Sequence, residues 1–390
     1  MNYFFRYLIQ YSGFFNDTLK KRSKIYFNAS YLYNYQSSCY NLISKKKFYY
    51  FIDPETFKFQ YGGNRAFYLN YIEYFRDLDG LIDPNNKISL DYLSNSNNFN
   101  DFFKKVIRFQ RTMLASTHIP LDFYKAIAEG TSKLLRYNPT EQLLFIISPY
   151  FEFNDIHDSS YNYNKKFSEK ESDFYTLLRF PKEILSNSDN IKKIYNDFKN
   201  QKGILLNIIE LDQYNINDLN QYFGNLIDLI YQFAQNNQYV ILMNNSEFGK
   251  YLQYFGLKDV CSNVMIGQRS YYYEPTRDTN RKANTDFSYI PLIERSVSFT
   301  SSNSLIKRCK ELKKMYPKGV LDLNLDSRIN KYYEFLEEKI NKINSSNLDI
   351  IVNEIERNFD KINHELHRRK YKYILKWKEV LLNKYKQYAN

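Results

Sequence analysis

The sequence predicts an α/β protein: a (β/α) barrel of the TIM type, regular or incomplete, with an all-α extension at its carboxyl end. Short apolar runs rich in β-branched and aromatic residues alternate with amphipathic helical repeats between residues 47 and 303. Alternation of this kind is typical of parallel strands joined by helical crossovers. After residue 303 the strand pattern ends and only helical periodicity continues, which predicts a separate helical region.

The clearest alternation lies between Gly203 and Gly267. Residues 204–209 form a nearly continuous apolar run, which is the pattern of a strand buried on both faces. Apolar residues at three- and four-residue spacing between 219 and 233 then predict an amphipathic helix. The elements expected next are a strand at 239–243, a short helix at 246–256 that ends at a glycine, and a strand at 261–266.

Similar patterns occur on both sides of this stretch. The further strands expected are 26–33, 48–52, 143–147 and 288–293. Helical periodicity at 102–114 and 123–135 separates two of them. Polar, low-complexity patches at 94–100 and 158–172 are interpreted as surface loops.

The same units also build a doubly wound open sheet, which is the alternative to a barrel. A dinucleotide-binding fold is not supported, because the chain contains no G-x-G-x-x-G motif and no P-loop, and has only 11 glycines. We divide the chain into a basic N-terminal segment joined to the barrel (1–46), the barrel-like domain (47–303) and a helical, basic C-terminal region (304–390).

The composition indicates a protein with a substantial core. The 390 residues are 43% hydrophobic and 25% charged, which excludes intrinsic disorder and a small disulfide scaffold. No run approaches the roughly 18 to 20 apolar residues of a membrane span, so we expect a cytoplasmic protein with no membrane partner. The three cysteines are far apart, and His364 and His367 have no third ligand nearby, so no metal and no cofactor are expected.

Positive charge gathers at the two ends of the chain. Residues 1–50 and residues 361–390 each carry a net charge of +7, so the rest of the +12 chain sums to −2. Clusters of this kind are typical of surfaces that bind polyanions, and the alternative is two solvated, lysine-rich ends. The side chains expected to contact nucleic acid, tRNA or DNA, are Lys45, Lys46, Lys47, Arg368, Arg369, Lys370, Lys372, Lys376, Trp377 and Lys378.

The C-terminal helix interleaves these cations with aromatic residues, so that Trp377 could stack on a base while the cations pair with phosphates. Tyr373, Trp377 and Leu381 also share one helical face, which equally predicts that the helix docks on the barrel and leaves its cations outside. A protein partner that binds through the C-terminal helices is a further expectation.

In a parallel sheet, functional side chains collect beyond the carboxyl ends of the strands. Polar residues at these positions could supply a nucleophile or base, recognise a heterocycle, or hold an anion. The candidate catalytic residues are Asp53, Glu210 and Asp212. The candidate substrate-binding residues are Asn244, Asn245, Glu247, Gln268 and Arg269.

Three stretches carry a resemblance to a known family. Residues 51–56 (FIDPET), 267–270 (GQRS) and 289–295 (YIPLIER) resemble tRNA-guanine transglycosylase-like barrels, a group that includes relatives that modify DNA with deazaguanines. The resemblance implies that Asp53 is a nucleophile that displaces a base, and that Glu210 or Asp212 recognises the incoming one. The zinc site of that family is absent, since Cys309 stands without neighbouring cysteines.

These observations lead to one functional hypothesis and two alternatives. We expect a nucleic-acid-binding α/β-barrel protein, a degenerate transglycosylase-like enzyme that modifies bases in tRNA or DNA. The first alternative is a non-enzymatic scaffold or interaction subunit of a mobile-element or defence system. The second is a barrel enzyme that acts on a small phosphorylated substrate and does not use the basic ends.

Overall fold

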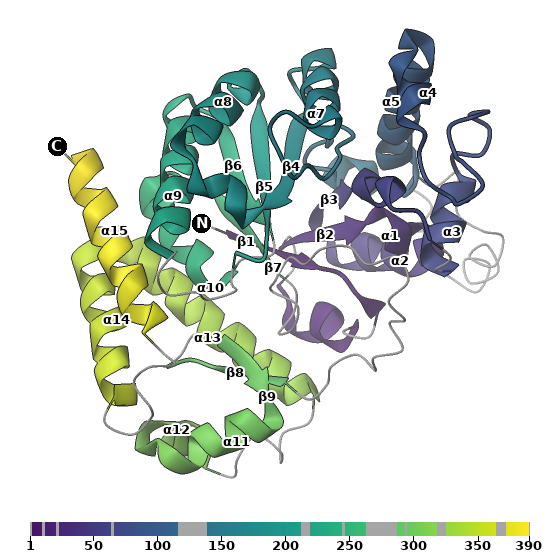
Figure 1. Cartoon of the computed structure of the whole chain (residues 1–390). Helices are drawn as coiled ribbons and strands as arrows, with labels where there is room; N and C mark the ends of the chain where they lie inside the picture. The colour runs from purple at the N-terminus through teal and green to yellow at the C-terminus, as the bar shows by residue number, and fades with distance from the viewer. Residues whose placement is uncertain are drawn as a thin grey trace, which may run out of the picture.

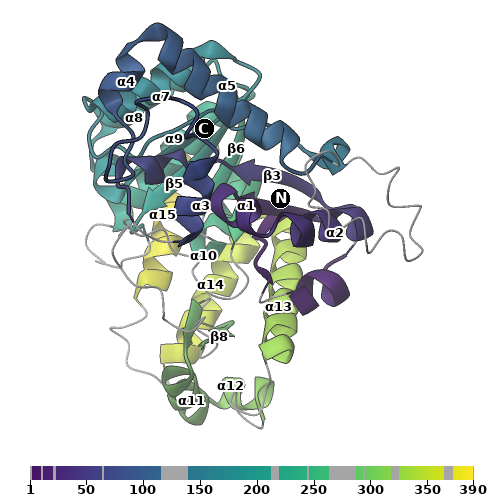
Figure 2. The same ribbon diagram turned by 90° about the vertical axis from the view of Figure 1, so that its right-hand side faces the viewer.

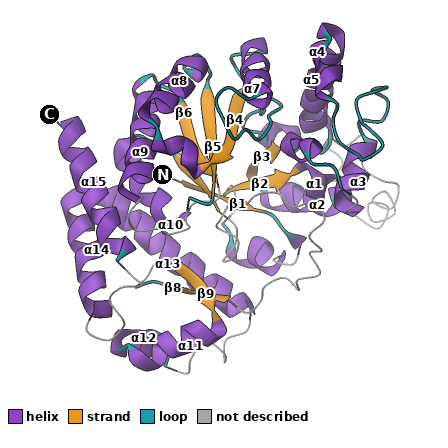
Figure 3. Ribbon diagram, in the orientation of Figure 1, coloured by secondary structure: helices purple, strands orange, loops and turns teal. Residues whose placement is uncertain are grey.

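The computed structural model describes residues 2–9, 12–20, 23–63, 66–115, 139–211, 219–243, 246–262, 287–292, 295–317, 325–363 and 372–389. Its centre is a sheet of seven strands in the order β3-β2-β1-β7-β6-β5-β4 (Figure 3, strands in orange). All neighbouring strands in it are parallel. The strands are β1 (Asn2–Arg6), β2 (Lys24–Asn28), β3 (Tyr49–Asp53), β4 (Tyr175–Pro181), β5 (Gly203–Ile209), β6 (Tyr239–Met243) and β7 (Asp259–Ser262).

The two edge strands, β3 and β4, are linked by an extended segment, residues 143–152. Leu143 bridges Tyr50 of β3, and Ile147 bridges Tyr175 of β4, both in parallel orientation. The segment therefore stands where an eighth strand would stand in a complete barrel. The predicted α/β class and the barrel-like sheet are confirmed, and the barrel is incomplete because the eighth position has isolated bridges in place of a continuous ladder.

Side chains satisfy the backbone of this linking segment where neighbouring strands do not. Each of four polar side chains accepts from the N–H and donates to the C=O of one residue in the segment, at distances of 2.6 to 2.9 Å. The pairs are Gln110 with Ile147, Thr56 with Tyr150, Asn164 with Phe151, and Gln60 with Glu152. Buried backbone groups need such partners, so these four side chains hold the eighth position in its extended form.

The inside of the curled sheet is filled by aromatic and aliphatic side chains. Tyr175 of β4 lies directly over Gly203 of β5, and its ring stacks on Phe145 with centroids 4.0 Å apart. A Cβ atom on Gly203 would lie 2.1 Å from the Tyr175 ring, so a larger residue at this interior position would force the ring to move. Below the apolar layer, at the amino end of the strands, Lys24 pairs with the buried Asp259 at 2.7 Å.

Helices cover the outside of the sheet (Figures 1 and 2). Their apolar faces pack with the outward-facing strand residues into one large core cluster. The helices of this part are α1 (Ala29–Asn34), α2 (Gln36–Lys46), α3 (Ala66–Glu73), α4 (Leu90–Ser94), α5 (Ser96–Thr112), α7 (Ser159–Lys170), α8 (Ser188–Phe198), α9 (Leu219–Gln235) and α10 (Ser246–Gly249).

Several predicted elements are confirmed and some are wrong. The strands at 48–52, 204–209 and 239–243 correspond to β3, β5 and β6. The strand expected at 26–33 is β2 followed by α1, and the helix expected at 123–135 lies outside the described residues. The polar patches at 94–100 and 158–172 are not loops, because α5 and α7 begin within them.

The loop predictions failed there because polar residues cover only the outer face of each helix. Asn95 caps α5 by accepting from the N–H groups of Asn97 and Asn98, while Phe99 is buried. In α7, Tyr161 and Phe167 are buried although the surrounding sequence is polar. A few large aromatic side chains on one face are enough to anchor a helix.

The C-terminal region is helical, as predicted, and it packs against the barrel. An antiparallel pair, β8 (Phe287–Ile290) and β9 (Arg295–Ser298), directly precedes this region, so the strand expected at 288–293 belongs to a separate small sheet. The helices are α11 (Phe299–Arg308), α12 (Lys310–Met315), α13 (Leu325–Ser345), α14 (Leu348–Asn363) and α15 (Tyr373–Ala389). In Figure 1, α15 runs beside α9, and Lys384 joins the two helices through Asp228 at 2.6 Å. No helix among the described residues is long and apolar enough to cross a membrane.

Candidate functional site

Polar side chains line the inside of the sheet at the carboxyl ends of its strands. Deeper in the barrel the same strands pack together through Phe4, Tyr26, Phe51, Leu177 and Leu205. Side chains two residues apart lie on the same face of a strand. The next interior positions toward the carboxyl ends are therefore Arg6, Asn28, Asp53, Arg179 and Asn207. These residues form what we call the rim cluster.

Asp53 is the member of the rim cluster best suited to proton transfer or nucleophilic attack. Its side chain is 5% exposed, and its Oδ1 accepts from the Tyr150 hydroxyl at 2.7 Å and from the backbone N–H of Glu55 at 3.0 Å. The pKa of Asp53 is raised to about 6, mainly by burial and to a smaller extent by the neighbouring Glu55 carboxylate. Near neutral pH this carboxyl group can thus exist with or without its proton.

Glu55 has a structural role in the same site. Its backbone is left-handed, with φ of 49°, and its side chain is 1% exposed. The carboxylate accepts from Asn28, from the backbone N–H of Ser30 at 3.0 Å and from Lys58 at 2.6 Å. Burial raises the pKa of Glu55. The charges of Lys58 and Arg6 and these hydrogen bonds outweigh that effect and hold the pKa below its ordinary value. Glu55 is therefore a fixed anion that orders the turn after β3.

A buried ion pair closes the opposite side of the site. Arg179 of β4 donates from Nε to Glu152 of the linking segment at 2.7 Å, and both side chains are almost fully buried. Tyr61 donates its hydroxyl to the other oxygen of Glu152. The Arg179 guanidinium also lies 4.3 Å from the centre of the Phe57 ring. Because Glu152 accepts from both Arg179 and Tyr61, the ion pair holds β4 and the linking segment together at this side of the site.

Three polar atoms in the rim cluster are buried and have no hydrogen-bond partner in the described part of the chain. They are Arg6 Nε, Asn28 Oδ1 and Asn207 Oδ1. A buried polar atom without a partner costs roughly 1–3 kcal/mol, so such atoms are rare and need an explanation. Because β2 and β5 stand four positions apart in the ring of strands, Asn28 and Asn207 face each other across the barrel.

Three of the predicted catalytic and substrate-binding residues lie within the described residues. Asp53 is central to the rim cluster, and Glu210 follows β5 with a left-handed backbone, φ of 58°, and a partly exposed side chain. Glu247 lies in α10 at the end of β6. Asp212, Asn244, Asn245, Gln268 and Arg269 lie outside the described residues.

The site contains residues that the sequence interpretation did not single out. These are Arg6, Asn28, Arg179 and Asn207, together with Lys58 and the supporting Tyr61. Their common signal is position: each of the first four lies two residues beyond an interior apolar residue. That signal becomes readable only when the inward face of each strand is known.

The basic ends of the chain are partly neutralised by ion pairs, most of them with acidic residues outside these ends. Near the N-terminus, Lys20 pairs with Glu337 at 2.8 Å and Lys24 pairs with Asp259. In α15, Lys376 pairs with Glu379 and Lys378 with Glu356, each at 2.6 Å. Arg368, Arg369 and Lys370 lie outside the described residues, and Lys372 is exposed. The sequence charge count therefore overstates the free positive charge of these ends.

The structure also places four other predicted nucleic-acid contacts, namely Trp377 and three lysines at the end of α2. Trp377 is 1% exposed and packs against Phe248, with ring centroids 5.6 Å apart, which is the docking alternative for this helix face. Lys45, Lys46 and Lys47 end α2 and precede β3, so they lie at the amino end of the strand that carries Asp53 at its carboxyl end. Four residue steps of about 3.3 Å separate the two ends of β3, roughly 13 Å.

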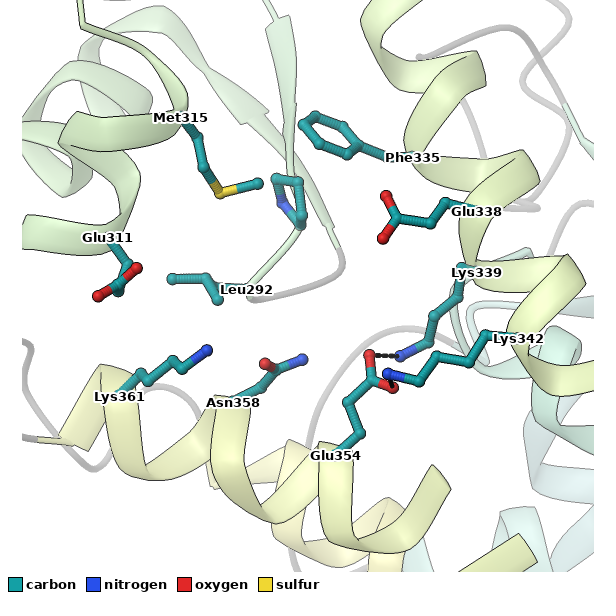
Figure 4. A pocket seen from close by; sticks show the side chains of 11 residues that line it. Leu292, Glu311, Met315, Phe335, Glu338, Lys339, Lys342, Glu354, Asn358 and Lys361 are labelled. Atoms are coloured by element: carbon teal, nitrogen blue, oxygen red, sulfur yellow. Dashed lines mark hydrogen bonds and ion pairs between the residues drawn. The ribbon is translucent and has the colours of Figure 1, made fainter. Parts of the chain in front are cut away.

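A concave site lies beside helices α12, α13 and α14, well away from the rim cluster in sequence (Figure 4). It has a volume of about 280 Å³. Leu292, Met315 and Phe335 form apolar walls, and Lys339 reaches Glu354 at 2.8 Å on the side of α13 and α14. This cleft suits a partner with both apolar and charged groups.

No model of a known protein family, no curated protein and no solved structure matches this chain. Among the described residues there is no group of three or more His, Cys, Asp and Glu side chains that could hold a metal ion.

Proposed function

We propose that this protein is an enzyme whose active site is the rim cluster, with Asp53 as the reacting carboxyl group. The observation that carries the proposal is the position of Asp53 at the carboxyl end of β3, inside the barrel, with a pKa raised to about 6. Active sites of (β/α) barrels lie at this end of the strands. A carboxyl group with a pKa near the working pH is suited to general acid–base catalysis, and its ionised form to nucleophilic attack.

The specific reaction that we propose is base exchange on tRNA or DNA, as the resemblance to transglycosylase-like barrels implies. In this reaction the ionised Asp53 attacks the sugar carbon, the base leaves with the electron pair of the broken bond, and an incoming base reverses the step. The resemblance of residues 51–56 supports the proposal. The internal ion pairs of Lys20, Lys24 and Lys378 do not add to it, because they reduce the charge available for phosphates.

The test incubates the full chain with tRNA, and separately with duplex DNA, in the presence of labelled guanine, and measures label in the polymer. We expect incorporation that increases with pH around 6 and falls at least 100-fold in Asp53→Asn. Lys192→Gln, an exposed change on α8, is the matched control. Label in neither polymer contradicts base exchange, and equal incorporation by Asp53→Asn contradicts the role of Asp53.

A scaffold function is the second candidate, and the cleft of the C-terminal region favours it. A protein partner that binds there would not need Asp53. Full biological activity in an Asp53→Asn variant, combined with loss of activity on Phe335→Glu in the cleft, would support the scaffold and exclude the enzyme. The reverse pattern would support the enzyme.

A further inference from the structure

We infer that the rim cluster binds an uncharged, polyhydroxylated ring, such as a sugar or a cyclitol, between Asn28 and Asn207. The inference rests on the proposed function only for the statement that the rim cluster is the active site. It starts from the three buried polar atoms that lack a partner in the described part of the chain. Buried polar atoms without a hydrogen-bond partner are suited to bind a ligand that supplies the missing hydrogen bonds.

The orientation of Asn28 is fixed by its neighbour. Its Nδ2 donates to the Glu55 carboxylate, which can only accept a hydrogen bond. The Oδ1 of Asn28 therefore points away from Glu55 and can only accept. Any ligand group at this atom must be a hydrogen-bond donor.

Asn207 of β5 sets a second requirement for the ligand, on the side of the barrel opposite Asn28. It is 3% exposed, lies on the interior face of β5 next to Arg179, and its Oδ1 is unpaired among the described residues. The ligand thus needs donors that point in opposite directions. On the first wall it also needs an acceptor for the Nε–H of Arg6.

The charges of the cluster select against a strongly charged ligand. Within the described residues, the cations of Arg6, Arg179 and Lys58 are matched by three carboxyl groups, those of Asp53, Glu55 and Glu152. A hydroxyl group is neutral and both donates and accepts, so a ring that carries hydroxyls around its edge can satisfy all three atoms. A flat amide edge presents its donor and acceptor on one side only.

The test measures binding of D-ribose, D-glucose and myo-inositol to the full chain by saturation-transfer NMR, with uracil as the flat amide-edge competitor. We expect at least one of the three polyols to bind, and Asn207→Leu to weaken it about tenfold or more. Asn196→Leu, an exposed change on α8, should leave binding unchanged. The urea midpoint of Asn207→Leu should equal or exceed that of the parent, because the substitution removes an unpaired buried atom.

Binding of uracil alone, or polyol binding that Asn207→Leu does not alter, overturns the inference. A marked loss of stability in Asn207→Leu also overturns it, since Asn207 would then have a structural partner. Asp53→Asn separates this inference from the proposed function. If polyols bind this variant but no Asp53-dependent reaction exists, only the proposed function fails; if the reaction exists and no polyol binds, only this inference fails.

Discussion

The side chain of Gln110 forms two hydrogen bonds with the backbone of Ile147, donating to its C=O at 2.7 Å and accepting from its N–H at 2.9 Å. An amide side chain on helix α5 thus makes the contacts that a neighbouring strand would make. Together with Gln60, Thr56 and Asn164 it keeps the segment between β3 and β4 extended.

Replacement of Gln110 by Leu should therefore destabilise the protein. Both backbone groups of Ile147 would remain buried without a partner, at roughly 1–3 kcal/mol each, so we expect the free energy of unfolding to fall by about 2–4 kcal/mol. Urea denaturation monitored by circular dichroism checks this. Gln235→Leu, at the exposed end of α9, should change stability by less than about 0.5 kcal/mol. Equal effects of the two substitutions would contradict the role given to Gln110.

The raised pKa of Asp53 predicts a pH dependence of stability. A carboxyl group whose pKa is higher in the folded state contributes stability below its unfolded pKa of about 4, and loses that contribution as the pH rises through 6. From ~1.4 kcal/mol per pKa unit, the loss is on the order of 2–3 kcal/mol. Asp53→Asn should remove this dependence and be the more stable form at pH 8. Parallel stability curves for the two proteins from pH 4 to pH 8 would show that the pKa of Asp53 is ordinary.

Gly203→Ala should disturb the barrel interior through one neighbour. The added methyl group would overlap the ring of Tyr175, so we expect a loss of about 1–3 kcal/mol or more. In the background of Tyr175→Leu the same change should cost clearly less, which a double-mutant cycle of unfolding free energies measures. Additive costs for the two changes would mean that Gly203 is required for another reason.

The burial of Trp377, the single tryptophan of the chain, gives a spectroscopic prediction. We expect blue-shifted emission, weak quenching by acrylamide, and no change in emission when tRNA or single-stranded DNA is added at low salt. Unfolding in urea should shift the emission to the red. Quenching of Trp377 by nucleic acid, with the protein folded, would restore the stacking hypothesis for this residue.

The sequence predicts those parts of the fold whose signal is local. The strand 239–243 is found at those residues, and Asp53 is found at a strand end as expected. The strand β1 was missed because Arg6 interrupts a run at the basic N-terminus, and β4 because it contains Arg179, whose burial depends on Glu152. A buried charge of this kind cannot be recognised before its partner is known.

The site was predicted less completely than the fold for a related reason. Strands covered on both faces read as continuous apolar runs, so the alternation that distinguishes the inside from the outside is lost. Asn207 lies within such a run in β5 and resembles a tolerated exception. Only the order of strands, with β5 opposite β2, reveals that Asn207 faces the same interior as Asn28.

The place of β1 in the sheet governs when this protein can finish folding during its synthesis. β1 is synthesised before the other six strands of the sheet. It pairs on one side with β2, but its other neighbour is β7, which follows nearly the whole barrel sequence. Until β7 emerges, β1 has an open edge that can pair with other chains. Translation of residues 7–262 is thus a period of exposure to aggregation, and the cell's chaperones would have their longest contact with β1.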